Sequence, residues 1–206
     1  MATKSRSNSR SGSSRTGNSR SARSARSKSN GRKGNGRMDA VSLLEHDHET
    51  VRKLLRELDE SNSRGQRKRQ QLLERVSAEI EAHAAIEEEI FYPSFRERGE
   101  TEDDEKLFFE AAEEHQLVHW LLPELKATDP GSELFSARAK VLRDLIEHHA
   151  EEEERELLPR MRKLASRDEL VRLGALMQER KRELLGTRSV SSDGGERAGR
   201  SRLGVR

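Results

Sequence analysis

Apolar residues recur every three or four positions through the middle of the chain, the spacing that places them on one face of an α-helix. This pattern predicts four long helices and a shorter fifth, over residues 38–61, 66–98, 101–127, 133–166 and 168–185. Turn residues in "SNSRG" separate the first helix from the second, and "TDPGS" separates the third from the fourth. Pro93 is expected to kink the second helix or to end its regular part. Long helices joined by short loops favour an all-α fold, an antiparallel up-down four-helix bundle with a short extra C-terminal helix.

Polar residues interrupt the apolar stripe at one level of each long helix. The interrupting residues are His48, His83 with Glu87, His115, and His149 with Glu153. Residues four positions apart lie above each other on a helix, so each His-x-x-x-Glu pair can point at one centre. A single inward histidine is typical of a hydrogen-bonded core residue. Burying several unpaired imidazoles and carboxylates costs several kcal/mol each, so four histidines and two glutamates together favour a metal site.

The chain also repeats itself. The segment "HAAIEEEIFYP" from His83 returns as "HAEEEERELLP" from His149, and "HETVRKLL" from His48 aligns with "HQLVHWLL" from His115. The first histidine precedes the second by 35 positions in one copy and by 34 in the other. The predicted bundle is therefore two copies of a helix pair, each with one histidine followed by one His-x-x-x-Glu.

This donor set suits transition metals. Imidazole is a ligand for iron, zinc, copper and nickel, carboxylates can bridge two cations, and bundle interiors commonly hold dinuclear sites. His119 lies one turn after His115 and adds a further candidate, although it aligns with Arg52 in the repeat and can instead sit at the edge of the stripe. The candidate ligands are His48, His83, Glu87, His115, His119, His149 and Glu153. A zinc or mononuclear site without a redox role is the alternative that these donors leave open.

Four segments together resemble the hemerythrin-like (HHE cation-binding) domain family. They are "HDHETV", "HAAIEEEIFYP", "EEHQLVHWLL" and "EHHAEEEERELLP", which follow the order and spacing of that family's helix signatures across residues 39–164. The resemblance implies a non-haem di-iron site with two iron ions per chain and an open position for O₂, nitric oxide or peroxide. It implies binding, sensing or turnover of that ligand, and it assigns bridging roles to Glu87 and Glu153, with Glu154 as an alternative to Glu153.

The neighbours of these candidates are expected to play lesser roles. His46 and His148 point to other faces and are predicted to lie at the surface or just behind the site. Four further acids, Glu88, Glu89, Glu151 and Glu152, are predicted on solvated helix faces. Around Pro93, the aromatic residues Phe91, Tyr92 and Phe95 are predicted as core at the end of the bundle.

Charge is distributed unevenly along the chain. Residues 1–37 hold eleven Lys or Arg and no acid, and residues 186–206 carry a net +3, so the formal total of +2 leaves about −12 on the middle (2 − 11 − 3). After Met1 the N-terminal segment has no apolar residue larger than Ala, and residues 186–206 have only scattered Val and Leu, so both ends are predicted to be disordered. The N-terminal segment offers enough cations for non-specific nucleic-acid binding but no aromatic residues for base stacking, and it can equally be a solubilising arm.

The remaining composition narrows the class of protein. Without cysteine, the chain has neither disulfides nor thiolate metal ligands. No apolar run approaches the ~20 residues of a membrane span, and the N-terminus lacks the apolar region of a secretory signal. We therefore expect a cytoplasmic protein, with the alternative that the Arg- and Ser-rich, acid-free start is an organelle transit peptide. Leu176 and Met177 in the fifth helix are expected to cap the bundle or, as the alternative, to mediate dimerisation.

Overall fold

The structure, a computed structural model, describes residues 38–193, and their side chains as far as residue 186. The basic segment 1–37 and residues 194–206 lie outside the described residues. The helices are α1 (Ala40–Asp59), α2 (Gln66–Ile86), α3 (Tyr92–Arg98), α4 (Glu102–Lys126), α5 (Glu133–Glu152), α6 (Leu158–Leu164) and α7 (Arg167–Asp193), with π-helical segments η1 (Glu87–Phe91) and η2 (Glu153–Leu157). Between residues 38 and 193 there is no strand, so the predicted all-α class is confirmed.

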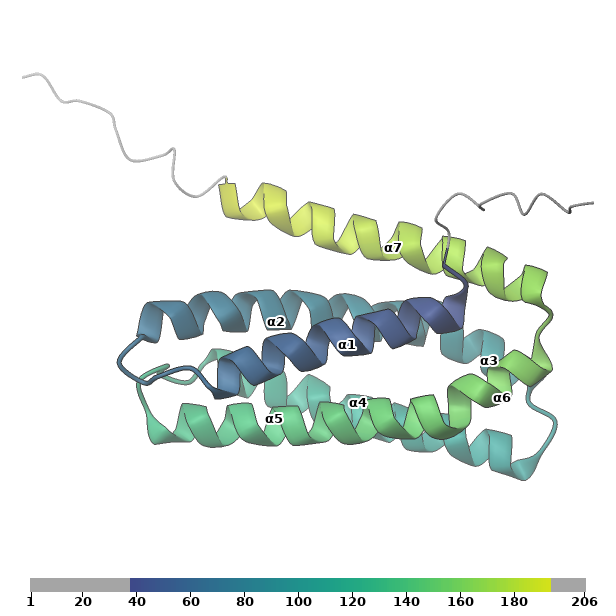
Figure 1. Cartoon of the computed structure of the whole chain (residues 1–206), viewed down its shortest axis with the longest axis horizontal. Helices are drawn as coiled ribbons and strands as arrows, with labels where there is room; N and C mark the ends of the chain where they lie inside the picture. The colour runs from purple at the N-terminus through teal and green to yellow at the C-terminus, as the bar shows by residue number, and fades with distance from the viewer. Residues whose placement is uncertain (1–37, 194–206) are drawn as a thin grey trace, which may run out of the picture. The chain divides into compact units, whose positions relative to one another are not determined.

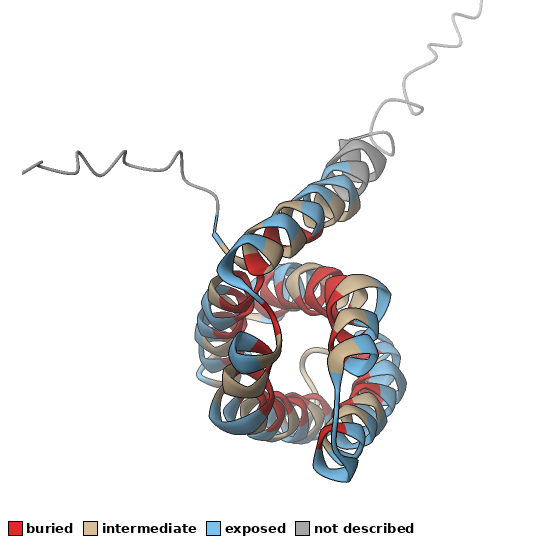
Figure 2. Cartoon of the chain, turned by 90° about the vertical axis from the view of Figure 1, so that its right-hand side faces the viewer, coloured by how far each residue is buried: buried red, intermediate tan, exposed pale blue. Residues whose placement is uncertain are grey.

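Helices α1, α2, α4 and α5 form the bundle, and α7 lies along the outside of α1 and α2 (Figure 1). Viewed end-on, the buried residues face the centre of the ring of helices, as amphipathic stripes require (Figure 2). Three helices of the bundle begin at side-chain caps: Asp39 accepts from the Ser42 N–H at 3.0 Å, Thr101 from the Asp104 N–H at 3.2 Å, and Ser132 from the Phe135 N–H at 3.2 Å. Such caps satisfy N–H groups that the first helical turn leaves without partners.

The bundle core consists of two apolar clusters with a polar layer between them. One cluster includes Leu55, Leu73 and Leu142, and the other includes Phe91 and Leu158, all at most 2% exposed. The helical stripes supply both clusters, because the candidate ligands interrupt each stripe near its middle. The polar layer is therefore shielded from water on both sides along the bundle axis.

Each long helix that contains a His-x-x-x-Glu pair continues through a π-helical turn. Pro93 was expected to kink the second helix or to end its regular part, and the regular helix does end before it: α2 stops at Ile86, η1 follows, and α3 begins at Tyr92. Within η1 the Tyr92 N–H donates to the Glu87 carbonyl five residues back, and in η2 the Leu158 N–H donates to the Glu153 carbonyl. A wider turn accommodates the following proline, which lacks an N–H and clashes with regular α-helical geometry. It also brings residue i+5 toward the face of residue i, whereas in an α-helix the two differ by about 140°.

The fifth predicted helix corresponds to α7, whose backbone extends to Asp193 rather than ending near residue 185. Met177 is fully buried in the second apolar cluster, whereas Leu176 is 61% exposed. The helix therefore packs against the side of the bundle through Met177 and not through Leu176. No helix among the described residues is both long and apolar enough to cross a membrane.

Candidate metal centre

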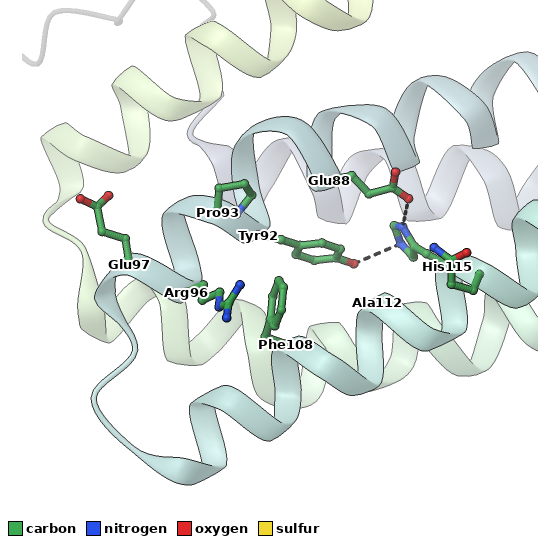
Figure 3. A pocket seen from close by; sticks show the side chains of 9 residues that line it. Glu88, Tyr92, Pro93, Arg96, Glu97, Phe108, Ala112 and His115 are labelled. Atoms are coloured by element: carbon green, nitrogen blue, oxygen red, sulfur yellow. Dashed lines mark hydrogen bonds and ion pairs between the residues drawn. The ribbon is translucent and has the colours of Figure 1, made fainter.

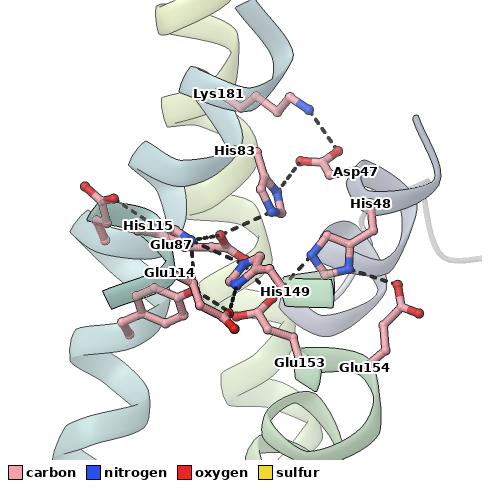
Figure 4. Close-up of polar contacts among 12 residues, drawn as sticks. Asp47, His48, His83, Glu87, Glu114, His115, His149, Glu153, Glu154 and Lys181 are labelled. Carbon is pink, nitrogen blue, oxygen red and sulfur yellow. Dashed lines mark hydrogen bonds and ion pairs between the residues drawn. The ribbon is translucent and has the colours of Figure 1, made fainter. Parts of the chain in front are cut away.

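Six of the seven predicted ligands meet in the polar layer at the middle of the bundle (Figure 4). They are His48 from α1, His83 from α2, Glu87 from η1, His115 from α4, His149 from α5 and Glu153 from η2, and each is at most 6% exposed. The ligand atoms of His48, His83, Glu87 and His149 all lie within 4.8 Å of one another. The six residues are called the inner group below.

The histidines of the inner group direct their Nε2 atoms toward its two carboxylates. Glu87 Oε2 lies 3.2 Å from the Nε2 of His83 and 3.3 Å from that of His115. Glu153 Oε2 lies 3.3 Å from the Nε2 of His48 and 3.9 Å from that of His149. Each glutamate therefore lies between histidines of two different helices, as a carboxylate bridging two cations would.

A second set of carboxylates faces the opposite nitrogen of each histidine. The Nδ1 contacts are His48 to Glu154 at 2.9 Å, His83 to Asp47 at 3.8 Å, His115 to Glu88 at 2.7 Å and His149 to Glu114 at 2.7 Å. Each acid lies on the element that comes before its histidine around the ring. Helix α1 supplies the acid that faces the histidine of α2, η1 the one for α4, α4 the one for α5, and η2 the one for α1. These four acids are called the outer carboxylates. The contacts of His48, His115 and His149 are hydrogen bonds, and an acceptor on Nδ1 fixes the tautomer and orients Nε2 toward a metal. At 3.8 Å, the contact between His83 and Asp47 is too long for a hydrogen bond.

The outer carboxylates were not predicted as part of the site, although the sequence contains a signal for them. Each one is the immediate neighbour of an inner-group residue: Asp47 and Glu114 precede the first histidine of each repeat, and Glu88 and Glu154 follow the glutamates. Glu88 was expected on a solvated face, and it is half-exposed but bonded to His115. Glu154, the alternative bridging residue, contacts His48 Nδ1 and accepts from Arg52 at 2.7 Å, so it lies behind the inner group.

Tyr92 belongs both to the core and to the site. Its ring is 2% exposed, as predicted for a core residue. Its hydroxyl donates to Glu153 Oε1 at 2.9 Å and lies 3.1 Å from His115 Nε2, on the inner side of the histidine. The π-helical turn explains this position, because it brings Tyr92 toward the face of Glu87.

His119 is the predicted ligand that the structure does not bring into the inner group. Its side chain is 48% exposed, and its Nε2 lies 2.8 Å from Glu88 Oε1 at the edge of α4. His46 is exposed, and His148 is 60% exposed beside Glu114 and Glu152.

Burial and neighbouring charges shift the pKa values of Glu87, Glu153, His83 and His48. Burial and the neighbouring Glu153 raise the pKa of Glu87 well above its usual value. Burial also acts to raise the pKa of Glu153, but His149 and His48 outweigh it and lower this pKa. Burial lowers the pKa of His83 to about 4. For His48, burial is outweighed by Glu153 and Glu154, which raise the pKa to about 10.

Several buried atoms of this centre have contacts but no hydrogen bond within the described chain. They are both carboxylate oxygens of Glu87, Oε2 of Glu153, Nε2 of His48, Nδ1 of His83 and Oδ2 of Asp47. A buried polar atom without a partner costs free energy, and native proteins rarely leave one. Unpaired carboxylate oxygens and imidazole nitrogens that face one another are the donors a cation requires, so the residues fit a metal.

Fold and site together define a class: an all-α bundle with a buried histidine and carboxylate cation site. The chain belongs to the hemerythrin HHE cation binding domain family, whose model matches residues 39–161. It is similar to a solved hemerythrin HHE cation binding domain-containing protein from Mycobacterium kansasii, with a TM-score of 0.66 and 25% identity over 78% of this chain and 96% of that one.

Among curated proteins, the chain is 30% identical over 125 residues to a DNA nickase of Nostoc sp. strain PCC 7120. The match covers 61% of this chain but 34% of the relative, so the chain spans about a third of that protein's length.

Proposed function

We propose that the inner group binds two iron ions and that this centre binds a small ligand, namely O₂, nitric oxide or hydrogen peroxide. The observation that carries the proposal is the set of six buried donors in which both oxygens of Glu87 lack hydrogen bonds. Mixed imidazole and carboxylate donors suit iron, and two carboxylates between four histidines suit a pair of cations rather than one.

The residues divide the work of holding the metals. The Nε2 atoms of the four histidines would be terminal ligands, and Glu87 and Glu153 would bridge. Bound iron would supply one-electron chemistry and an open coordination position for the small ligand. Three of the outer carboxylates, Glu154, Glu88 and Glu114, accept from the histidine they face and keep it oriented. In metalloproteins such partners contribute about 10–100-fold to metal affinity or activity.

The surroundings control what reaches the centre. The apolar clusters on both sides exclude water, which protects a reactive bound ligand from side reactions. The Tyr92 hydroxyl donates to Glu153 Oε1 at 2.9 Å, and its oxygen lies 3.1 Å from His115 Nε2. It is the hydroxyl placed to donate a hydrogen bond into the inner group.

Metal analysis tests the proposal. The full-length protein is purified without chelators, iron and zinc are counted per chain, and the visible spectrum in air is recorded before and after adding azide. Two irons per chain and a charge-transfer band that azide shifts are expected. Zinc or no metal in a folded protein would contradict the iron proposal and leave a structural bundle.

The basic segment 1–37 supports a second candidate, association with nucleic acid. Its eleven cations suit phosphate contacts, and one curated relative is named a DNA nickase. Deleting residues 1–37 is expected to abolish salt-sensitive binding to duplex DNA while metal content stays unchanged. Equal DNA binding with and without the segment would rule out this role.

A further inference from the structure

A cavity of about 530 Å³ opens between α3 and α4, beside the inner group (Figure 3). Tyr92 and His115 line it, and both side chains also face the centre of the bundle. Phe108, Pro93 and Ala112 supply apolar wall, and Arg96 lies at one side. The cavity is far larger than O₂ or peroxide requires and can hold a small organic molecule.

Arg96 carries an unpaired charge beside this cavity. Its guanidinium carbon lies 5.0 Å from the ring centroid of Phe108 and 5.8 Å from that of Phe109. It makes no ion pair or hydrogen bond with any residue that the structure describes. An exposed arginine stacked on aromatic rings keeps its planar fork of N–H donors available for a ligand.

The internal repeat provides a matched comparison for Arg96. The equivalent residue in the second copy is Arg162, 13 positions after His149 as Arg96 is 13 after His83. Arg162 lies 3.6 Å from Asp39 Oδ2 and 3.7 Å from Glu45 Oε2, and it donates to Ser42 Oγ at 3.3 Å.

The three partners of Arg162 are all replaced in the first copy. Asp39, Ser42 and Glu45 correspond to Lys106, Phe109 and Ala112, which lie 67 positions later, as His115 does from His48. The substitutions remove both carboxylates, substitute an aromatic ring for the hydroxyl, and leave only a methyl group in the cavity wall where the other copy has Glu45. An anion from outside the chain would take the place of the missing carboxylates.

We propose that the cavity between α3 and α4 binds a small organic monocarboxylate, with its carboxylate on Arg96 and its apolar body against Phe108, Pro93 and the Tyr92 ring. A guanidinium binds a carboxylate through two parallel N–H···O bonds. A single negative charge is favoured because Glu88 and Glu97 also line the cavity and would repel a dianion such as a phosphate monoester.

Calorimetric titration with benzoate tests this site, with the neutral isostere benzamide as the comparison ligand. Benzoate is expected to bind at least about tenfold more tightly than benzamide, because a charge-assisted pair is stronger than neutral hydrogen bonds. Arg96→Met should reduce benzoate affinity to the level of benzamide. Ala112→Glu should do the same by supplying the carboxylate that Glu45 provides to Arg162. Arg162→Met is the matched control and should leave benzoate affinity unchanged.

Each titration is run on protein with bound metal and on chelator-treated protein that circular dichroism shows to be folded. Arg96-dependent binding in both forms is expected, since the cavity does not require the cation. Equal affinities for benzoate and benzamide would overturn the proposal. Benzoate binding that needs metal and ignores both Arg96→Met and Ala112→Glu would also overturn it, and would place the carboxylate on the metal. The iron proposal does not depend on either result.

Discussion

The two halves of the bundle supply equivalent donors but surround them differently. In each half a histidine on the first helix and a His-x-x-x-Glu pair before a π-helical turn reach the centre, and a proline follows in both. The repeated positions are those whose side chains face the inner group. The donors at the centre are therefore the same in the two halves, whereas the residues that surround these donors differ.

The divergence is concentrated at two places. Tyr92 in the first half corresponds to Leu158 in the second, so one half alone brings a hydroxyl to the inner group. Among the outer carboxylates, Asp47 is bound by Lys181 of α7 at 2.8 Å, whereas its counterpart Glu114 faces His148 at the surface. Helix α7 covers α1 and α2 and gives the first half a support that the second half lacks.

The largest effect is expected from substituting the inner-group glutamates. Comparing the metal content of the two variants tests whether the two halves contribute equally to metal binding. Glu87→Gln and Glu153→Gln each remove one of the carboxylates proposed to bridge two irons, so each should lower iron from the proposed two to at most one per chain, as measured by metal analysis. Glu151→Gln, on the exposed face of α5, is the control and should keep both irons. Loss of iron in one glutamate variant but not in the other would show that the halves are not equivalent.

The next effect concerns the support from α7. Lys181 is 14% exposed and lies 2.8 Å from Asp47 and 2.9 Å from Glu79, so Lys181→Met leaves the buried Asp47 without its cation. We expect a loss of about 3 kcal/mol in the free energy of unfolding, measured by urea denaturation of metal-free protein.

Arg182→Met on the exposed side of the same helix is the control for Lys181→Met and should change stability by less than about 0.5 kcal/mol. Similar losses in the two variants would mean that α7 stabilises the bundle only through general packing. The pairing with Asp47 would then have no special role.

A smaller effect compares the turns that follow α3 and α6. Asp104 is 3% exposed, accepts from Arg160 at 2.6 and 2.8 Å, and accepts from the N–H groups of Glu100 and Thr101. Asp104→Asn is expected to cost about 2 kcal/mol at pH 7. Glu169 in the second turn is partly exposed and bonded mainly to Ser166, so Glu169→Gln should cost less.

The stability cost of Asp104→Asn is expected to depend on pH, and the lowered pKa values define the sign of that dependence. The bond from Arg160 holds the pKa of Asp104 below its usual 3.8, and Ser166 lowers that of Glu169 to about 2. A carboxyl group whose pKa is lowered on folding stabilises the fold above its unfolded pKa and loses that contribution as the pH falls through the folded value. The cost of Asp104→Asn should therefore shrink below pH 3.8 in urea titrations, and a cost independent of pH would contradict the assignment.

The smallest effect concerns the hydroxyl that distinguishes Tyr92 from Leu158. Tyr92→Phe removes one buried hydrogen bond to Glu153 and should cost about 1 kcal/mol in urea denaturation, with both irons retained. With this variant, both halves of the bundle have an apolar side chain at this position. Loss of iron in this variant would mean that Tyr92 is required to position Glu153.

Much of the site was predictable because it lies on the same periodic stripes as the core. Spacing of three and four residues placed the four histidines and two glutamates on inner faces, and the structure brings these six together. The same spacing also nominated His119, which the structure leaves half-exposed beside Glu88. Periodicity specifies a helix face to within part of a turn, so it does not decide whether a residue at the edge of a stripe points inward.

The sequence by itself determined the helices, the repeat and the identity of the donors, since these depend on spacing within single helices. Only the tertiary structure decided which carboxylate contacts which histidine, because Asp47, Glu88, Glu114 and Glu154 each reach across to a neighbouring helix. It also decided that Lys181 supports Asp47 and that Arg96, unlike Arg162, has no carboxylate partner among the residues whose side chains are described. Contacts of this kind depend on the rotation and separation of packed helices, which no local pattern encodes.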